Sequence, residues 1–246
     1  FKVDNAESLA LTVETVVIGN KAIVETVLVA YDALSTDAQA ELMIEKVLLD
    51  SLIVEIERQE AIEVEVTTFI TNHSIALALT TGTVVIGDQA VVDAARTAYD
   101  LLSIDAKARL TDEKALLDSL YIEIDGQISV SLEVSTFTTN NAYVLALTVG
   151  TVEETERSYV EVALADFENL STLAKAELTF EKALLDSLLV VITAQEAEAS
   201  EVADYLMGYA FVLALTVETV EIADKAIVED ALTVYDLLSA EVQAGL

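Results

Sequence analysis

The chain of 246 residues has no cysteine, no proline and no tryptophan, and it has only seven glycines. Without cysteine it can form neither a disulfide nor a thiolate metal site. Proline makes up about 5% of average proteins. Because proline interrupts helices, its absence favours long ones. The glycines form no Gly-x-Gly-x-x-Gly or Gly-Lys-Ser/Thr loop, so the sequence gives no support for nucleotide binding.

Positive charge is scarce as well. The sequence has 12 Lys and Arg residues and 44 Asp and Glu residues, which gives a net charge of −32. Like charges repel, so we expect no nucleic-acid partner and no anionic membrane partner. No run of about 18 uncharged apolar residues occurs, so we expect no membrane insertion. Hydrophobic residues make up 54% of the chain, which excludes a disordered tail.

The dominant positive feature is an internal repeat of 68 residues without insertion or deletion. Leu-Ala-Leu-Thr, Tyr-Asp (Phe-Glu in the third copy) and Leu-Leu-Asp-Ser-Leu recur at this step. They begin at Leu9, Leu77, Leu145 and Leu213, at Tyr31, Tyr99, Phe167 and Tyr235, and at Leu48, Leu116 and Leu184. We therefore divide the chain into copies 1–68, 69–136, 137–204 and a partial fourth copy, 205–246.

The second copy is the easiest to interpret. Asp88 is expected to be the N-cap of a helix running to Leu102, with an apolar stripe through Val91, Ala95 and Ala98. The corresponding caps in the other copies are Asn20, Glu156 and Asp224, of which the glutamate is the weakest.

Two further helices are expected in the same copy. Ser103 should cap a short helix ending near Leu110. A third helix should start at Thr111-Asp112 and carry Leu116, Leu117, Leu120 and Ile124.

Residues 121–134 are ambiguous. Their apolar positions alternate around Asp125-Gly126, which is typical of a β-hairpin with a type I′ turn, and residues 53–66 partly agree. The third copy instead has the strongly helix-forming run Ala194-Gln195-Glu196-Ala197. We prefer a helix that continues through Leu-Ala-Leu-Thr into the next copy. The prediction is an all-α tandem array of three-helix bundles joined by long shared helices, and the alternative is an α+β fold with a hairpin between repeats.

The segment Tyr99-Asp100-Leu101-Leu102-Ser103-Ile104-Asp105-Ala106-Lys107-Ala108-Arg109-Leu110-Thr111-Asp112 resembles the "AAYDALTxEQKALVTN" segment of tandem three-helix repeats in Gram-positive bacterial surface and secreted proteins. Gly82-Thr83-Val84 and Asp88-Gln89-Ala90 are also similar. The resemblance recurs in every copy. It implies helical modules strung between functional domains as stalks, spacers or adhesion arms, and it transfers no catalytic residue. The chain departs from the pattern in its linking helix, where Val, Thr, Ser and Ile replace Ala and Lys.

No side-chain pattern predicts catalysis or a cofactor. His73 is the only histidine, which excludes paired-histidine zinc motifs, and it occurs in one copy only. Two sets of carboxylates recur, and we interpret them as a solvated helix face. They are Asp50, Asp118 and Asp186, and Glu45, Glu113 and Glu181. Weak calcium binding between acidic faces is the alternative, although no EF-hand pattern is present.

Aromatic residues offer the other candidate site. Tyr31, Tyr99, Phe167 and Tyr235 are interpreted as core wedges at the end of the second helix, in preference to sugar-stacking platforms.

These observations predict a non-catalytic structural segment, a stalk, spacer or filament and surface-layer building block, of an extracellular bacterial protein. The alternative is an adhesion module that binds a glycan or a host protein. Coexisting apolar content and negative charge suggest self-association into a filament or layer. The chain opens Phe1-Lys2-Val3-Asp4 without a signal peptide, so we expect its signal and cell-wall anchor to lie outside this segment.

Overall fold

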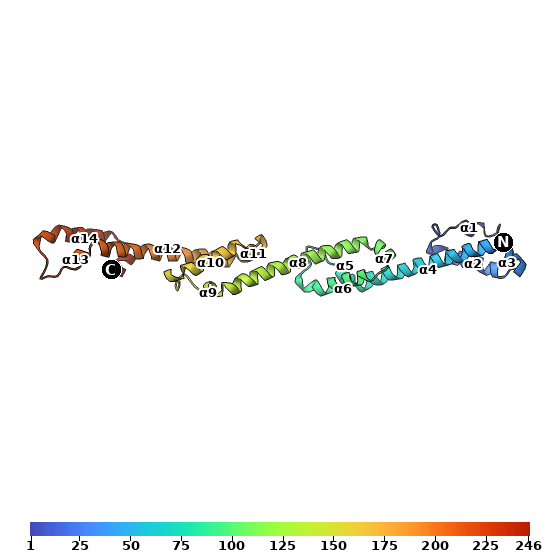
Figure 1. Cartoon of the computed structure of the whole chain (residues 1–246), viewed down its shortest axis with the longest axis horizontal. Coiled ribbons are helices and arrows are strands. Elements are labelled where there is room, and N and C mark those ends of the chain that lie inside the picture. Colours follow the sequence, from blue (N-terminus) through green and yellow to red (C-terminus); the bar gives the residue numbers. More distant parts are fainter. The chain divides into compact units, whose positions relative to one another are not determined.

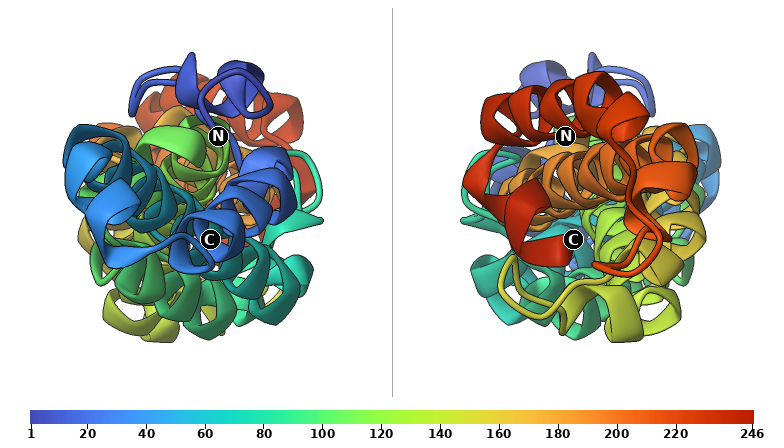
Figure 2. Two further views of the ribbon diagram at one scale, coloured as in Figure 1. Left: turned by 90° about the vertical axis from the view of Figure 1, so that its right-hand side faces the viewer. Right: turned by 90° about the vertical axis from the view of Figure 1, so that its left-hand side faces the viewer.

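The computed structural model describes all 246 residues, and every regular element in it is a helix (Figure 1). The end-on views likewise contain only helices and connecting loops (Figure 2). The all-α prediction is therefore confirmed. No helix is both long enough and apolar enough to cross a membrane.

The elements return at the period of the sequence. Four short helices are α1 (Ala6–Leu9), α5 (Ser74–Leu77), α9 (Ala142–Leu145) and α13 (Ala210–Leu213). They are followed by the 3-10 turns η1 (Ile18–Asn20), η2 (Ile86–Asp88), η3 (Glu154–Glu156) and η4 (Ile222–Asp224). Next come α2 (Lys21–Asp32), α6 (Gln89–Asp100), α10 (Arg157–Glu168) and α14 (Lys225–Leu237).

A second short helix and a long helix complete this order. The short ones are α3 (Thr36–Glu41), α7 (Ile104–Arg109), α11 (Thr172–Glu177) and α15 (Ala240–Gly245). The long ones have 30 residues each and are α4 (Met43–Asn72), α8 (Thr111–Asn140) and α12 (Thr179–Gly208).

The hairpin alternative for residues 53–66 and 121–134 is wrong, because both ranges lie inside long helices. The helix buries Leu117, Leu120 and Ile124, which are spaced three and four residues apart, and leaves Ile122 exposed. Full burial of each such side chain contributes about 1.5–3 kcal/mol, which outweighs the small differences in local helix propensity.

The expectation that the long helix continues through Leu-Ala-Leu-Thr is also wrong. In the first linking segment α4 ends at Asn72, and α5 forms a separate turn that ends at Leu77. Beyond it, the Thr80 N–H donates to Thr83 Oγ1 at 3.1 Å, and the Val84 N–H donates to the Thr80 carbonyl at 2.9 Å. These bonds form a turn that satisfies the backbone without a continuous helix.

The predicted N-caps divide into two groups. The Ser103 Oγ accepts from the Ala106 N–H at 3.2 Å, so Ser103 caps α7 as expected. Asp88 does not cap α6; its carboxylate accepts from the Val85 N–H, three residues earlier, at 3.0 Å. Asn20, Glu156 and Asp224 make the same backward bond. Asp88 itself has helical backbone angles, which place its carboxylate over the preceding 3-10 turn.

The chain divides into two compact units, Phe1–Ile128 and Ser129–Leu246, with the boundary inside α8. The first unit holds two apolar clusters. The first core contains Val16, Val24, Val27, Leu49, Leu52 and Ile56. The second core contains Ile62, Val66, Phe69, Ala76, Val84, Val92, Ala95, Tyr99, Ala106, Leu110, Leu117, Leu120 and Ile124. Helix α4 therefore supplies its first half to one core and its second half to the other.

The second unit has one large apolar cluster, the third core. It contains Phe137, Val144, Val152, Val160, Ala163, Phe167, Leu178, Leu185, Leu188 and Ile192. The first half of α12 supplies Leu185, Leu188 and Ile192, and its second half packs against α15. Within this unit too, one long helix contacts two successive sets of shorter helices.

Candidate functional site

The aromatic residues singled out in the sequence are core residues. Tyr31, Tyr99 and Phe167 are buried, which confirms the core interpretation for these three, and Tyr235 is half-buried. Each packs edge-on against the aromatic residue 30 positions earlier, with ring centroids 6.0–6.1 Å apart. The three buried rings offer no open face to a sugar.

The recurrent aspartates lie on helix surfaces. Asp50 and Asp186 accept hydrogen bonds from Lys46 and Lys182, one helical turn earlier, at 2.6 Å and 2.7 Å. Asp118 pairs in the same way with Lys114. The Lys114 ammonium lowers the pKa of Asp118. These pairs account for the aspartates without a bound ion.

The recurrent glutamates do not converge with the aspartates. Glu45 is paired with Lys2, whose ammonium lowers its pKa, while Glu113 and Glu181 make no ion pair. No group of three or more His, Asp or Glu side chains is arranged to hold a metal ion.

His73 lies at the break between α4 and α5. Its ring packs on Phe69, with centroids 5.0 Å apart. Asn5 and Asn141 occupy the same place in other copies and donate to the carbonyls of Phe1 and Phe137. The position is therefore a helix junction that accepts several polar residues.

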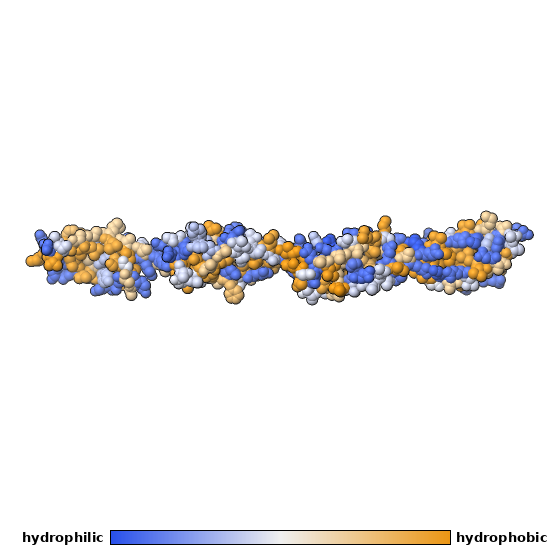
Figure 3. Space-filling view, turned by 90° about the horizontal axis from the view of Figure 1, so that it is seen from below, coloured by the Kyte–Doolittle hydropathy of each residue, from blue (hydrophilic) through white to orange (hydrophobic).

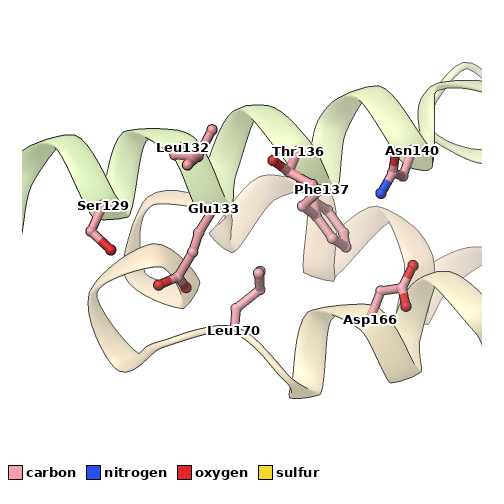
Figure 4. A pocket seen from close by; sticks show the side chains of 8 residues that line it. All are labelled: Ser129, Leu132, Glu133, Thr136, Phe137, Asn140, Asp166 and Leu170. Atoms are coloured by element: carbon pink, nitrogen blue, oxygen red, sulfur yellow. The ribbon is translucent and has the colours of Figure 1, made fainter.

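A cleft of ≈ 410 Å³ lies between the C-terminal part of α8 and the junction of α10 and α11 (Figure 4). Both of its carboxylates already have partners. Glu133 accepts from the Ser171 N–H at 2.8 Å, and Asp166 accepts from Asn141 Nδ2 at 3.2 Å. Phe137 is buried in the third core. The carboxylates of this cleft therefore join helices together and are not free for a ligand.

A second cleft, of ≈ 590 Å³, lies in the same unit, shares Asn140 with the first, and carries exposed aromatic side chains. Tyr143 follows the end of α8, and Tyr159 lies in the first turn of α10. Their rings meet edge to face, with centroids 5.7 Å apart. Tyr143 is 59% exposed and Tyr159 is 57% exposed. Asn140, Asn141, Val144 and Val162 complete the lining. We call this surface the tyrosine cleft.

One ring of the tyrosine cleft is held by an acid. The Tyr143 hydroxyl donates to Glu156, and this bond raises the pKa of the phenol and lowers the pKa of the carboxyl group. Glu156 also accepts from the Glu153 N–H, so a single carboxylate fixes both the 3-10 turn and the tyrosine. The arrangement gives an oriented apolar surface beside the amide group of Asn140, which suits binding better than bond-breaking chemistry.

The sequence interpretation missed the tyrosine cleft because its residues are not repeated. Ile75 and Phe211 stand at the place of Tyr143, and Val91 and Ile227 at the place of Tyr159. Attention to recurring positions selects the core. A search for aromatics present in one copy alone would have found Tyr159, whose counterparts are all aliphatic, but not Tyr143, which has an aromatic counterpart in Phe211.

The chain has no recognisable relatives in three comparisons. No protein-family model matches it, and no curated protein or solved structure is significantly similar to it.

Proposed function

We propose that this chain is a non-catalytic structural segment, a stalk or spacer of an extracellular bacterial protein, built as a tandem array of three-helix bundles. One observation carries the proposal. Helix α4 places Leu49, Leu52 and Ile56 in one core and Ile62, Val66 and Phe69 in the next. A helix shared in this way makes each bundle the support of its neighbour, as in repeat proteins whose stability depends on contacts between adjacent repeats.

Polar contacts also connect α4 to the helices around the second core. The second half of α4 is tied to α7 by the ion pairs Arg58–Asp105 and Glu63–Arg109. The Glu65 carboxylate accepts the Ser103 N–H at 3.0 Å, at the first residue before α7, and this bond lowers the pKa of Glu65. Glu133 makes the same bond to Ser171 in the second unit. Each exposed ion pair adds little to the stability. Burial of the apolar side chains of α4 in two cores therefore contributes more.

The resemblance to bacterial surface repeats supports an extracellular or cell-wall location. Numerous large apolar side chains are exposed, and the displayed face carries many apolar residues (Figure 3). Their burial between copies of the chain would favour self-association into a filament or layer.

Removal of one complete period tests the spacer proposal. Deletion of residues 69–136 joins Thr68 to Phe137 and restores a 30-residue helix, because α4 and α8 have the same length and register. We expect a cooperatively folded, helical protein whose end-to-end distance is shorter by one fixed step. The distance would be measured by energy transfer between dyes at residues 2 and 244.

A matched deletion of residues 69–134 is the control. It rotates Ile62 and Val66 by about 200° relative to Phe137, at about 100° per residue. This variant should lose stability and cooperativity. If both deletions fold equally well, or if the in-phase deletion leaves the end-to-end distance unchanged, the chain is not a modular spacer.

The tyrosine cleft favours a second function, adhesion to a glycan. Exposed aromatic rings are suited to the apolar faces of sugars, and Asn140 places an amide group beside them. Glycan-array binding tests this function. Tyr159→Ala should reduce any binding at least tenfold. Phe211→Ala removes an aromatic ring that is also 59% exposed, at the place of Tyr143 in the fourth copy, and should have no effect. Equal binding by both variants, or none by the wild type, argues against this function.

A further inference from the structure

The tyrosine cleft lies among acidic side chains. The Glu156 carboxylate accepts from the Tyr143 hydroxyl and from the Glu153 N–H, and both bonds lower its pKa, so this carboxylate is ionised at neutral pH. The side chain of Glu153 is exposed and adds a second negative charge. The hydrogen bond to Glu156, and to a smaller extent the charge of Glu153, raise the pKa of the Tyr143 phenol. The rim of the cleft therefore carries negative charge.

Every cationic side chain of the unit Ser129–Leu246 already pairs with a carboxylate. Arg157 is the cation next to Glu156 in sequence, and it pairs with Glu161 at 2.8 Å and with Glu196. The remaining pairs are Lys175–Glu168, Lys182–Asp186 and Lys225–Glu229. The negative charge at the tyrosine cleft is therefore not neutralised by a free cation of its own unit, and it attracts cationic ligands.

The two aromatic rings attract cations as well, because the face of an aromatic ring is electron-rich. A phenol that donates its proton to a carboxylate gains electron density in the ring, which strengthens this attraction at Tyr143. Elsewhere in the chain such contacts are already made: the Arg96 guanidinium lies 4.0 Å from the centroid of the Tyr121 ring. No cation of the chain lies over Tyr143 or Tyr159, although both rings are more than half exposed.

We propose that the tyrosine cleft binds an amino sugar with a free ammonium group, such as a glucosamine unit of a glycan. This inference rests on the glycan function proposed above for the same cleft and names the class of sugar. The apolar face of the sugar would pack on the tyrosine rings, and its hydroxyls would bond with the Asn140 amide. Its ammonium would lie beside the Glu156 carboxylate.

The third copy alone combines two exposed tyrosines with this acid. The fourth copy has Phe211 and Asp224 at the corresponding places, but Ile227 replaces the second tyrosine. The first and second copies have Glu7 and Ile75 in place of the first tyrosine. We therefore expect one binding site per chain.

Isothermal titration calorimetry on the full chain tests the inference with two ligands, a short glucosamine oligomer and its N-acetylated, uncharged counterpart. At about 0.15 M salt the attraction by distant charges is screened beyond about 8 Å. The glucosamine oligomer should bind once per chain and at least tenfold more tightly than the N-acetylated one. Tyr159→Ala should weaken the binding of both oligomers at least tenfold, and circular dichroism should show that this variant keeps its helices.

A change of charge without a change of size isolates the role of the acid. In Glu156→Gln the amide oxygen can still accept the Glu153 N–H while the amide nitrogen donates to the Tyr143 hydroxyl. This variant should bind the glucosamine oligomer at least tenfold more weakly and the N-acetylated oligomer equally well. The control is Glu154→Gln, which removes the same charge at an exposed position without a side-chain hydrogen bond or ion pair. It should bind both oligomers as the wild type does.

The outcomes separate this inference from the glycan function on which it rests. Equal or tighter binding of the N-acetylated oligomer, lost in Tyr159→Ala, would overturn the choice of an amino sugar and leave the glycan function intact. Binding of neither oligomer, or binding that Tyr159→Ala does not weaken, would overturn both. Equal weakening by Glu156→Gln and Glu154→Gln would show that only the net charge matters. A short lysine peptide that binds at Tyr159 more tightly than the glucosamine oligomer would identify a protein ligand instead.

Discussion

Gln59, Gln127 and Gln195 are the residues whose role is most clearly defined by side-chain contacts. Each lies in a long helix and donates to the carbonyl of a buried valine 43 residues earlier in the chain. The bond therefore ties the long helix to the loop before α2, α6 or α10. A buried carbonyl without a hydrogen-bond partner destabilises the folded state. The glutamine therefore contributes more to the free energy of unfolding than its area of contact suggests.

Replacement of this glutamine gives a prediction at the residue scale. Gln127→Ala should lower the free energy of unfolding by about 1–3 kcal/mol, because it leaves the Val84 carbonyl unpaired. The change would be measured by urea denaturation. Gln89→Ala, on an exposed position that makes no side-chain hydrogen bond, should change stability by less than about 0.5 kcal/mol. A similar loss in both variants would show that the bond is unimportant.

At the scale of elements, the conformation of α8 distinguishes the all-α fold from the α+β alternative with a hairpin. Its residues 121–134 alternate as a strand would, but their burial follows helical spacing. Gly126 lies within the helix, has no positive φ, and a Cβ at this position would meet no atom within 4 Å. A helix therefore requires a negative φ at Gly126, whereas a type I′ hairpin turn requires a positive φ.

The consequence is a prediction for Gly126→Ala. In the helix this change should stabilise the protein by roughly 0.5–1 kcal/mol, because alanine loses less backbone entropy than glycine. In a type I′ hairpin turn the same change would destabilise it, since the turn needs positive φ. Thermal denaturation followed by circular dichroism measures the sign. A lower midpoint for Gly126→Ala would contradict a helix through residue 126.

Charge dominates at the scale of the whole molecule. The 12 cationic side chains are largely used in pairs, which leaves most of the 44 carboxylates without a counterion from the chain. Self-repulsion of a net charge of −32 destabilises the compact state. Salt screens this repulsion over about 10 Å at 0.1 M, and it also weakens the ion pairs, each of which contributes at most about 1 kcal/mol.

We therefore expect the melting temperature to rise by at least a few degrees between about 0.01 and 0.5 M NaCl. Differential scanning calorimetry would measure it, with CaCl₂ at equal ionic strength as the comparison. A larger rise in CaCl₂ would indicate calcium binding beyond screening. A lower melting temperature in NaCl would mean that the ion pairs outweigh the repulsion.

Acid should remove the stabilising contribution of one carboxylate, Glu55, below the ordinary carboxyl range. Hydrogen bonds from Arg58 and Gln59 lower the pKa of Glu55 to about 2. A carboxyl group whose pKa is lower in the folded state stabilises that state above its unfolded pKa, about 4.3. We expect this contribution to be lost as the pH falls from about 4.5 to about 2. Glu55→Gln should reduce the acid sensitivity of unfolding, whereas Glu57→Gln, at a neighbouring exposed position, should leave it unchanged.

The sequence by itself determined the 68-residue period and the serine caps and favoured the helical class, because spacing, capping chemistry and the absence of proline are properties of neighbouring residues. Only the tertiary structure decided between helix and hairpin at residues 121–134, where the local pattern supports both and burial against other helices selects one. It also decided that the long helix ends before Leu-Ala-Leu-Thr and that the Asp88 carboxylate accepts the N–H of the earlier residue Val85. The tyrosine cleft likewise depends on two residues 16 positions apart whose meeting requires folded helices.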